Sequence, residues 1–193
     1  MATQGPNSPG TLTSESNGSG NAWSNPSNAG ASDDSYASII MPSSFYGDNL
    51  YATNFGFSIP SGATINGITV EAEGKGSSSG FVHIYRAQLT KLGVGTIVGA
   101  ALGPSSNFTT TDTYYTFGSS SNLWSTTWTD ADINASGFGV RIIPETSDDT
   151  KTLYIDHIRR TVDYTAAAVG HPAMRRTGGV PGMLGAGRIG RSW

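Results

Sequence analysis

Apolar and polar residues alternate over most of residues 36–165, the period expected of half-buried β-strands. In Thr64–Gly74, for example, Ile68, Val70 and Ala72 face one way and the polar residues between them face the other. Bounded by turn residues, the pattern predicts eight strands. They are Tyr36–Met41, Leu50–Ile59, Thr64–Gly74, Phe81–Lys91, Gly95–Ala100, Thr113–Gly118, Phe138–Ile143 and Thr152–Thr165.

The last of these strands changes parity along its length. Leu153 and Ile155 lie on one face, whereas Ile158 and the apolar positions after it lie on the other. An extra residue restores alternation in such a case, so the sequence predicts a β-bulge near Asp156-His157.

One segment has a helical pattern. Thr129–Ala135 offers Thr129 as N-cap and two aspartates in the first turn. Eight strands, one short helix and no β-α-β spacing predict an all-β fold, an antiparallel β-sandwich of jelly-roll type. An immunoglobulin-like sandwich is the alternative, although the sequence lacks the Cys–Trp–Cys pattern that marks true members of that fold.

Both ends of the chain lack this alternation. Residues 1–35 are polar and turn-rich and predict an extended N-terminal arm or loop, of which residues 1–20 are expected to be a loose terminus. Trp23 is expected to pack on the body. Residues 75–80 predict a hairpin loop. Residues 166–193 are a Gly-rich tail that should not fold alone, which leaves 36–165 as the sandwich.

The tail differs from a simple linker because it carries arginines and apolar residues. Residues 1–165 hold all fourteen Asp and Glu against seven Lys and Arg, whereas the tail holds four arginines and no acid. We expect the tail to bind a protein surface rather than nucleic acid, with a disordered solubility tail as the alternative. The predicted partner-binding residues are Met174, Arg175, Arg176, Met183, Leu184, Arg188, Ile189, Arg191 and Trp193.

Composition excludes several classes of protein. The 193 residues contain no cysteine, which removes disulfides, thiolate metal sites and thiol nucleophiles. No apolar run approaches the ~20 residues of a membrane span, and the N-terminus lacks a signal-peptide pattern. We therefore expect no membrane association.

Two segments match the residue pattern of a known site motif but lack the structural context that the motif requires. Gly76-Ser77-Ser78-Ser79-Gly80 fits G-x-S-x-G but lies in a predicted loop with no helix after it. Gly185–Gly190 fits G-x-G-x-x-G, yet the sequence ends three residues later. We expect neither to carry chemistry and predict no cofactor.

The remaining polar candidates favour structural roles. His83, His157 and His171 show no spacing that would bring them together as metal ligands or pair them with a nucleophile. Asp33-Asp34 and Asp148-Asp149 do not fit a Ca²⁺-binding loop. We therefore expect no enzyme and no metal site.

Aromatic residues leave two interpretations open. In strands they usually serve core packing, but exposed Trp and Tyr on a β-sandwich can stack against a sugar ring. The residues concerned are Tyr46, Tyr51, Phe55, Phe57, Tyr85, Tyr114, Tyr115, Trp124 and Trp128.

Several segments between residues 23 and 165 form a recognisable set of strand and turn motifs. The motifs are Trp23-x-Asn25-Pro26-x-Asn28-Ala29, Asp33-Asp34 with Tyr36-Ala37, Phe55-Gly56-Phe57-x-Ile59-Pro60-x-Gly62-Ala63-Thr64-Ile65-x-Gly67-Ile68-x-Val70, Trp128-Thr129-x-Ala131-Asp132-Ile133-Asn134, Phe138-Gly139-Val140, and Ile155-Asp156-His157-Ile158 with Val162-Asp163-Tyr164. With these motifs the sequence resembles virion structural proteins of tailed bacteriophages, and none of the motifs is a catalytic signature.

The resemblance implies a jelly-roll component of a phage particle, made in the bacterial host cytoplasm and located in the virion. The first expectation is a non-enzymatic capsid decoration (cement) protein that docks on the major capsid lattice through its tail. It is expected to be a homo-oligomer, and a trimer is the favoured form. A neck or tail fibre or adaptor protein is the alternative. A carbohydrate-binding β-sandwich module is a further alternative.

Overall fold

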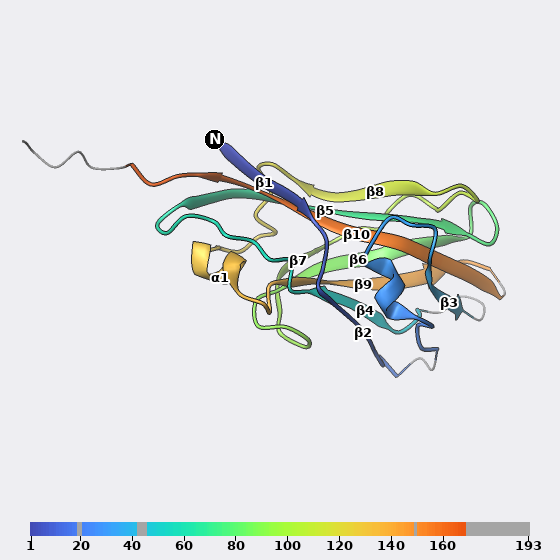
Figure 1. Cartoon of the computed structure of the whole chain (residues 1–193). Coiled ribbons are helices and arrows are strands. Elements are labelled where there is room, and N and C mark those ends of the chain that lie inside the picture. Colours follow the sequence, from blue (N-terminus) through green and yellow to red (C-terminus); the bar gives the residue numbers. More distant parts are fainter. Residues whose placement is uncertain (19–20, 42–45, 149, 169–193) are drawn as a thin grey trace, which may run out of the picture.

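Two antiparallel sheets of five strands pack face to face in the computed structural model (Figure 1). The structure describes residues 1–18, 21–41, 46–148 and 150–168. Sheet A consists of β1 (Ala2–Asn7), β3 (Ala37–Met41), β5 (Thr64–Gly76), β8 (Thr113–Ser119) and β10 (Lys151–Thr165). Sheet B consists of β2 (Thr11–Glu15), β4 (Asn49–Thr53), β6 (Val82–Thr90), β7 (Ile97–Leu102) and β9 (Gly139–Thr146).

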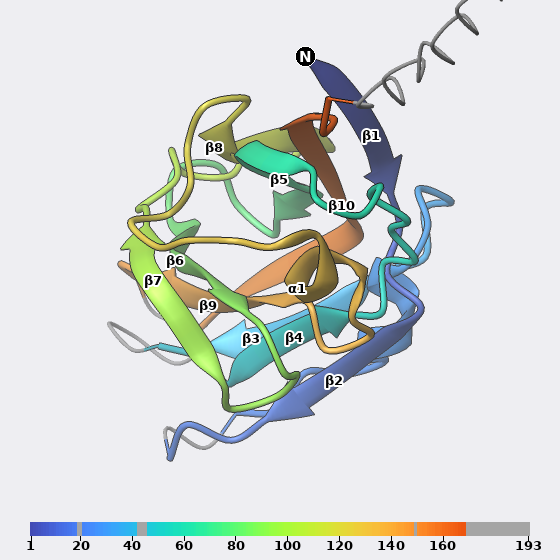
Figure 2. The same cartoon turned by 90° about the vertical axis from the view of Figure 1, so that its left-hand side faces the viewer.

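The chain passes from one sheet to the other at almost every connection, which makes the sandwich of jelly-roll type (Figure 2). All eight predicted strands are present as β3 to β10. The predicted hairpin at residues 75–80 is wrong, because β5 and β6 belong to different sheets and this loop crosses between them. Paired apolar faces close the core between the sheets.

Strand β10 is the strand to which most of sheet A is attached. One of its edges pairs with β5 along its length. Its other edge is shared by β3, next to Lys151–Ile155, and by β1, next to residues 160–164. The register shifts between Ile155 and His157, which confirms the predicted bulge at Asp156. Gly30 bridges to His157 in the gap between β3 and β1.

The N-terminal residues differ from the expectation of a loose terminus. Strand β1 pairs with β10 and β2 pairs with β4, so residues 1–15 belong to the two sheets. Both are edge strands held by main-chain hydrogen bonds, and they need no apolar alternation for that. Trp23 packs on the body as expected, 5% exposed, and its Nε1 donates to Asp48 O at 2.7 Å.

Two local deviations have backbone causes. The predicted strand Leu50–Ile59 ends at Thr53, because Asn54 (φ 60°) and Gly56 (φ 65°) take left-handed conformations that interrupt a strand. The predicted helix is α1 (Asp130–Asn134). Thr129 accepts from Asp132 N and Asp132 accepts from Thr129 N, which completes a capping box.

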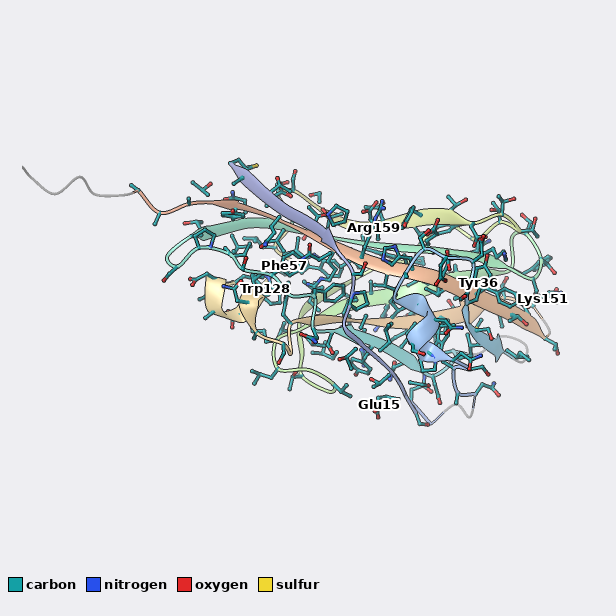
Figure 3. The ribbon with its side chains drawn as sticks, in the orientation of Figure 1. Glu15, Tyr36, Phe57, Trp128, Lys151 and Arg159 are labelled. Carbon is teal, nitrogen blue, oxygen red and sulfur yellow. The ribbon has the colours of Figure 1, made fainter. Side chains whose placement is uncertain are left out.

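The sandwich has two distinct ends. Phe57 and Trp128 mark the end with α1, and Lys151 marks the opposite end (Figure 3). Strand β10 starts at the Lys151 end and finishes beside β1, where Ala2 pairs with Tyr164. Its 15 residues span roughly 45 Å. The first described residues and the last residues of β10 therefore lie together, far from the Lys151 end.

One cation lies inside the aromatic part of the core. Arg160 is fully buried, with its guanidinium 3.5 Å from the ring centroid of Phe138 and 5.0 Å from that of Phe55. Its three side-chain nitrogens have no hydrogen-bond partner among the described residues. Burial lowers the pKa of Arg160 well below its ordinary value. The aromatic faces offset part of the desolvation cost of this charge.

We expect Arg160→Met to stabilise the protein by about 1–4 kcal/mol, because it keeps an unbranched chain between the rings and removes an unpaired buried charge. Urea unfolding at pH 7 measures the change. Arg160→Ala is the matched control, since it removes the same charge but leaves a cavity and should be less stable than Arg160→Met. A lower midpoint for Arg160→Met than for the natural protein would show that the charge is needed.

Candidate functional site

The outer face of sheet B carries a surface pair of aromatic rings. Tyr46 is 40% exposed and Tyr85 is half-buried, and their ring centroids are 4.6 Å apart with planes inclined by 39°. Tyr46 bridges to Glu145 of β9, and Tyr85 belongs to β6. The pair of rings therefore lies near the Lys151 end of the sandwich. The pKa of Tyr46 is raised, first by its hydrogen bond with Tyr85 and then by burial, so its phenol is neutral at pH 7.

A bulge in β6 explains why Tyr85 reaches this surface. Ile84 pairs with Pro144 and Arg86 pairs with Ile143, so Tyr85 is an extra residue in the ladder. Such a residue brings two successive side chains to the same face. The Arg86 guanidinium accordingly lies 4.6 Å from the Tyr85 ring centroid, and its Nη2 donates to the Tyr85 hydroxyl at 2.8 Å.

Two hollows flank Tyr85 and Arg86. The first has a volume of about 240 Å³ and the second of about 530 Å³. Both share Tyr85 and Arg86 as a common wall. The first is completed by Asn17, Tyr46, Asn49, Arg141 and Ile143, and the second by Gln88, Ala101, Leu102, Gly103 and Pro104.

Planar polar side chains lie beside the aromatic pair. Arg141 and Tyr51 are register partners that alternate with fully buried core residues, which places both on the outer side of sheet B. Arg141 Nη2 donates to Gln88 Oε1. Arg141 Nε and Asn49 Oδ1 are buried without a partner among the described residues. This face therefore combines apolar rings with unused hydrogen-bonding groups.

The outer face of sheet A differs because its arginine is paired with a carboxylate, although Glu73 Oε2 is buried there without a partner among the described residues. Arg159 binds Glu71 through two hydrogen bonds, of 2.8 and 3.0 Å, and its guanidinium lies 3.7 Å from the Tyr114 ring centroid (Figure 3). The ion pair raises the pKa of Arg159. These groups are satisfied internally, so the candidate site is on sheet B.

Sheet A does bring together a serine and a histidine, a contact that no spacing in the sequence predicts. Ser8 Oγ lies 2.8 Å from His157 Nε2, and Tyr114 Oη lies 3.0 Å from His157 Nδ1. Burial is the main cause that lowers the pKa of His157. The contacts tie the end of β1 to the bulge of β10, and the two hollows on sheet B are lined by other residues.

The other sequence candidates have local roles. His83 Nε2 lies 2.9 Å from Glu145 Oε2. In the G-x-S-x-G segment, Ser77 exchanges hydrogen bonds with Thr152 of the neighbouring strand β10 and makes no strand-to-helix elbow. Asp33 accepts from Ser35 N and Asp34 accepts from Tyr36 Oη.

The described part of the chain has neither a cluster of metal-binding side chains nor a membrane-spanning helix. There, no three His, Asp or Glu residues are placed to hold a metal ion. Nor, over the same residues, is any helix long and apolar enough to cross a membrane. Asp149, His171, Gly185–Gly190 and all nine predicted partner-binding residues of the tail lie outside the described residues.

The aromatic candidates divide between core and surface. Five belong to the buried core, as expected from core packing: Phe55, Phe57, Tyr115, Trp124 and Trp128. Tyr51 is also buried, but it lies on the outer side of sheet B. Tyr114 is half-buried on sheet A. Tyr46 and Tyr85 form the surface pair. The sequence reasoning missed Asn49, Arg86, Gln88 and Arg141, although a parity change after Ile84 in the sequence could have indicated the bulge that exposes Arg86.

Comparisons with known proteins give solved structures with a similar fold. No protein-family model matches the chain, and no curated protein matches it. A structure titled "CBM4 structure and function" is 17% identical with a TM-score of 0.40, and covers 69% of this chain and 87% of its own. TmCBM61 in complex with β-1,4-galactotriose is 12% identical with a TM-score of 0.41, covering 80% and 93%. The N-terminal cellulose-binding domain of Cellulomonas fimi β-1,4-glucanase C is 15% identical with a TM-score of 0.34, covering 84% and 91%.

The buried His157 predicts a loss of stability on acidification. Its pKa is lowered in the folded state from the ordinary 6.5, so below pH 6.5 the unfolded chain binds a proton that the folded chain excludes. The free energy of unfolding should therefore fall from pH 7 to pH 5, by at most about 1.4 kcal/mol per pH unit from this group.

His157→Gln keeps a polar side chain without the titration and should show a smaller fall in urea unfolding over the same range. The raised pKa of Asp156 acts in the opposite direction, because the folded state then favours its protonated form, and its effect is present in both proteins. Equal pH dependence of the two proteins would contradict the assignment.

Proposed function

We propose that this protein is a non-enzymatic carbohydrate-binding β-sandwich and that the Tyr46–Tyr85 face of sheet B binds the sugar. The observation that carries the proposal is the exposed aromatic pair between two hollows, with Arg86, Gln88 and Arg141 beside it. The proposal rests on this geometry and not on the similar solved structures, whose TM-scores are below 0.5.

The chemistry of the face suits a sugar ring. The apolar C–H face of a pyranose packs against an aromatic ring, while its hydroxyls accept and donate hydrogen bonds. Planar guanidinium and amide groups can bind two neighbouring hydroxyls at once. A few convergent polar groups beside apolar walls are typical of small-ligand sites.

The geometry also restricts the form of the sugar. Because the two rings are inclined by 39°, they cannot both lie flat on an extended crystalline surface. The hollows on either side of Tyr85 instead suit a single oligosaccharide chain that runs across β6. We therefore expect binding to soluble glycans and not to crystalline cellulose.

The test is a glycan microarray followed by calorimetry on the best-binding glycan. Tyr85→Ala and Tyr46→Ala should each weaken binding by roughly tenfold, because each removes one stacking surface. Phe81→Ala is the matched control, since Phe81 is 38% exposed, near the exposure of Tyr46, and lines neither hollow. No binding to any glycan, or equal loss in the Phe81 variant, would contradict the proposal.

A second proposal is that the protein is carried in a tailed-phage particle, as the resemblance over residues 23–165 implies. We propose a capsid decoration protein that docks through residues 166–193, with a neck or tail position as the alternative. The geometry is compatible with it, because β10 ends at Thr165 beside Ala2, roughly 45 Å from the Lys151 end. Docking there leaves the Tyr46–Tyr85 face accessible.

Deletion of residues 166–193 tests this second proposal. The shortened protein should keep its circular dichroism spectrum and its glycan binding but should no longer co-purify with particles, because it lacks the arginines and apolar residues of the tail. Electron cryomicroscopy of particles carrying the full chain then locates it on the shell, in trimers, or at the neck or tail. Normal incorporation of the shortened protein would contradict docking through the tail.

A further inference from the structure

Some lysine and arginine side chains of the described residues are paired with carboxylates, and others are not. Lys75, Lys91, Lys151 and Arg159 each form an ion pair with a carboxylate. Arg86, Arg141 and Arg160 form no ion pair with any carboxylate among the described residues. Arg160 is in the core, and the other two line the same hollow of about 240 Å³.

This local excess of positive charge contrasts with the charge of the body. Residues 1–165 hold twice as many acidic as basic residues, yet the two arginines of the hollow have no carboxylate partner among the described residues. The nearby carboxylate Glu145 lies 2.9 Å from His83 Nε2 and forms no ion pair with either arginine, so it offsets only part of their charge. Unpaired guanidinium groups in a hollow attract an anion from outside.

The hydrogen bonds that the two arginines do make are with neutral groups. Arg86 Nη2 donates to the Tyr85 hydroxyl, and Arg141 Nη2 donates to the carbonyl oxygen of Gln88. These contacts orient both guanidinium groups without neutralising them. Arg141 Nε is buried and has no partner among the described residues, which leaves a donor unused at this hollow.

We propose that the hollow binds an acidic sugar, with its carboxylate held by Arg86 and Arg141 and its ring against Tyr46 and Tyr85. This inference rests on the proposed carbohydrate-binding function and adds the class of ligand. A carboxylate is planar and accepts two parallel hydrogen bonds from one guanidinium, so it matches the two groups in shape and charge. A neutral sugar would leave both positive charges unpaired in the hollow.

The first experiment is a microarray that holds neutral, carboxylated and sulfated glycans side by side, probed with the full chain. Calorimetry then compares oligogalacturonate, or the best-binding carboxylated glycan, with its methyl ester, which has nearly the same size but no charge. We expect the acid to bind at least tenfold more tightly than the ester, and its affinity to fall as salt is raised.

Arg86→Gln and Arg141→Gln should each reduce binding of the acid by about tenfold to a hundredfold and binding of the ester by a smaller factor, so that the preference for the acid over the ester is lost. Arg86 is exposed, so its replacement tests the proposal even where Arg141→Gln alters the fold. Lys151→Gln is the control of equal charge change, because Lys151 pairs with Asp148 and lines neither hollow.

The outcomes separate this inference from the function on which it rests. Preference for carboxylated glycans with loss in both arginine variants supports the acidic-sugar site. Equal binding of acid and ester, or binding of sulfated glycans alone, overturns the inference while carbohydrate binding stands. Failure to bind any glycan overturns the carbohydrate-binding proposal itself.

Discussion

The pairing of β10 with β5 is the constraint on which the rest of the structure depends. It runs the length of a 15-residue strand and leaves the other edge of β10 for β1 and β3. The bulge at Asp156 keeps this long strand buried on both sides of the break, because it brings Ile155 and Ile158 to the same core face. Without that extra residue, half of β10 would turn its apolar side chains to solvent.

The two outer faces of the sandwich carry similar residues that have different roles. On sheet A, an arginine, a tyrosine and a glutamate contact one another, so the cation of this face is neutralised. On sheet B, a second bulge turns Tyr85 and Arg86 outward together, and Arg141 reaches them from β9. The difference between a structural cluster and a binding surface therefore lies in the hydrogen bonds and charges that remain unused.

The sequence predicted what depends on alternation and missed what depends on pairing. Strands β3 to β10 and the bulge at Asp156 follow from parity alone. The same shift of parity occurs between Ile84 and Ala87, and reading it would have located the bulge at Tyr85. Strands β1 and β2 are polar edge strands without an apolar period. The approach of Tyr46 and Arg141 to Tyr85 needs the partners of β9, which local pattern does not specify.

The pairing of β1 with β10 also affects the order in which the protein can fold. Ala2 pairs with Tyr164, so β1 must wait for β10, which is made later, before sheet A can close. Until then β1, β3 and β5 all lack their shared neighbour, and their main-chain groups stay open to other chains. Folding of this sandwich is consequently non-local, and its nascent chain is exposed to aggregation until β10 has been made.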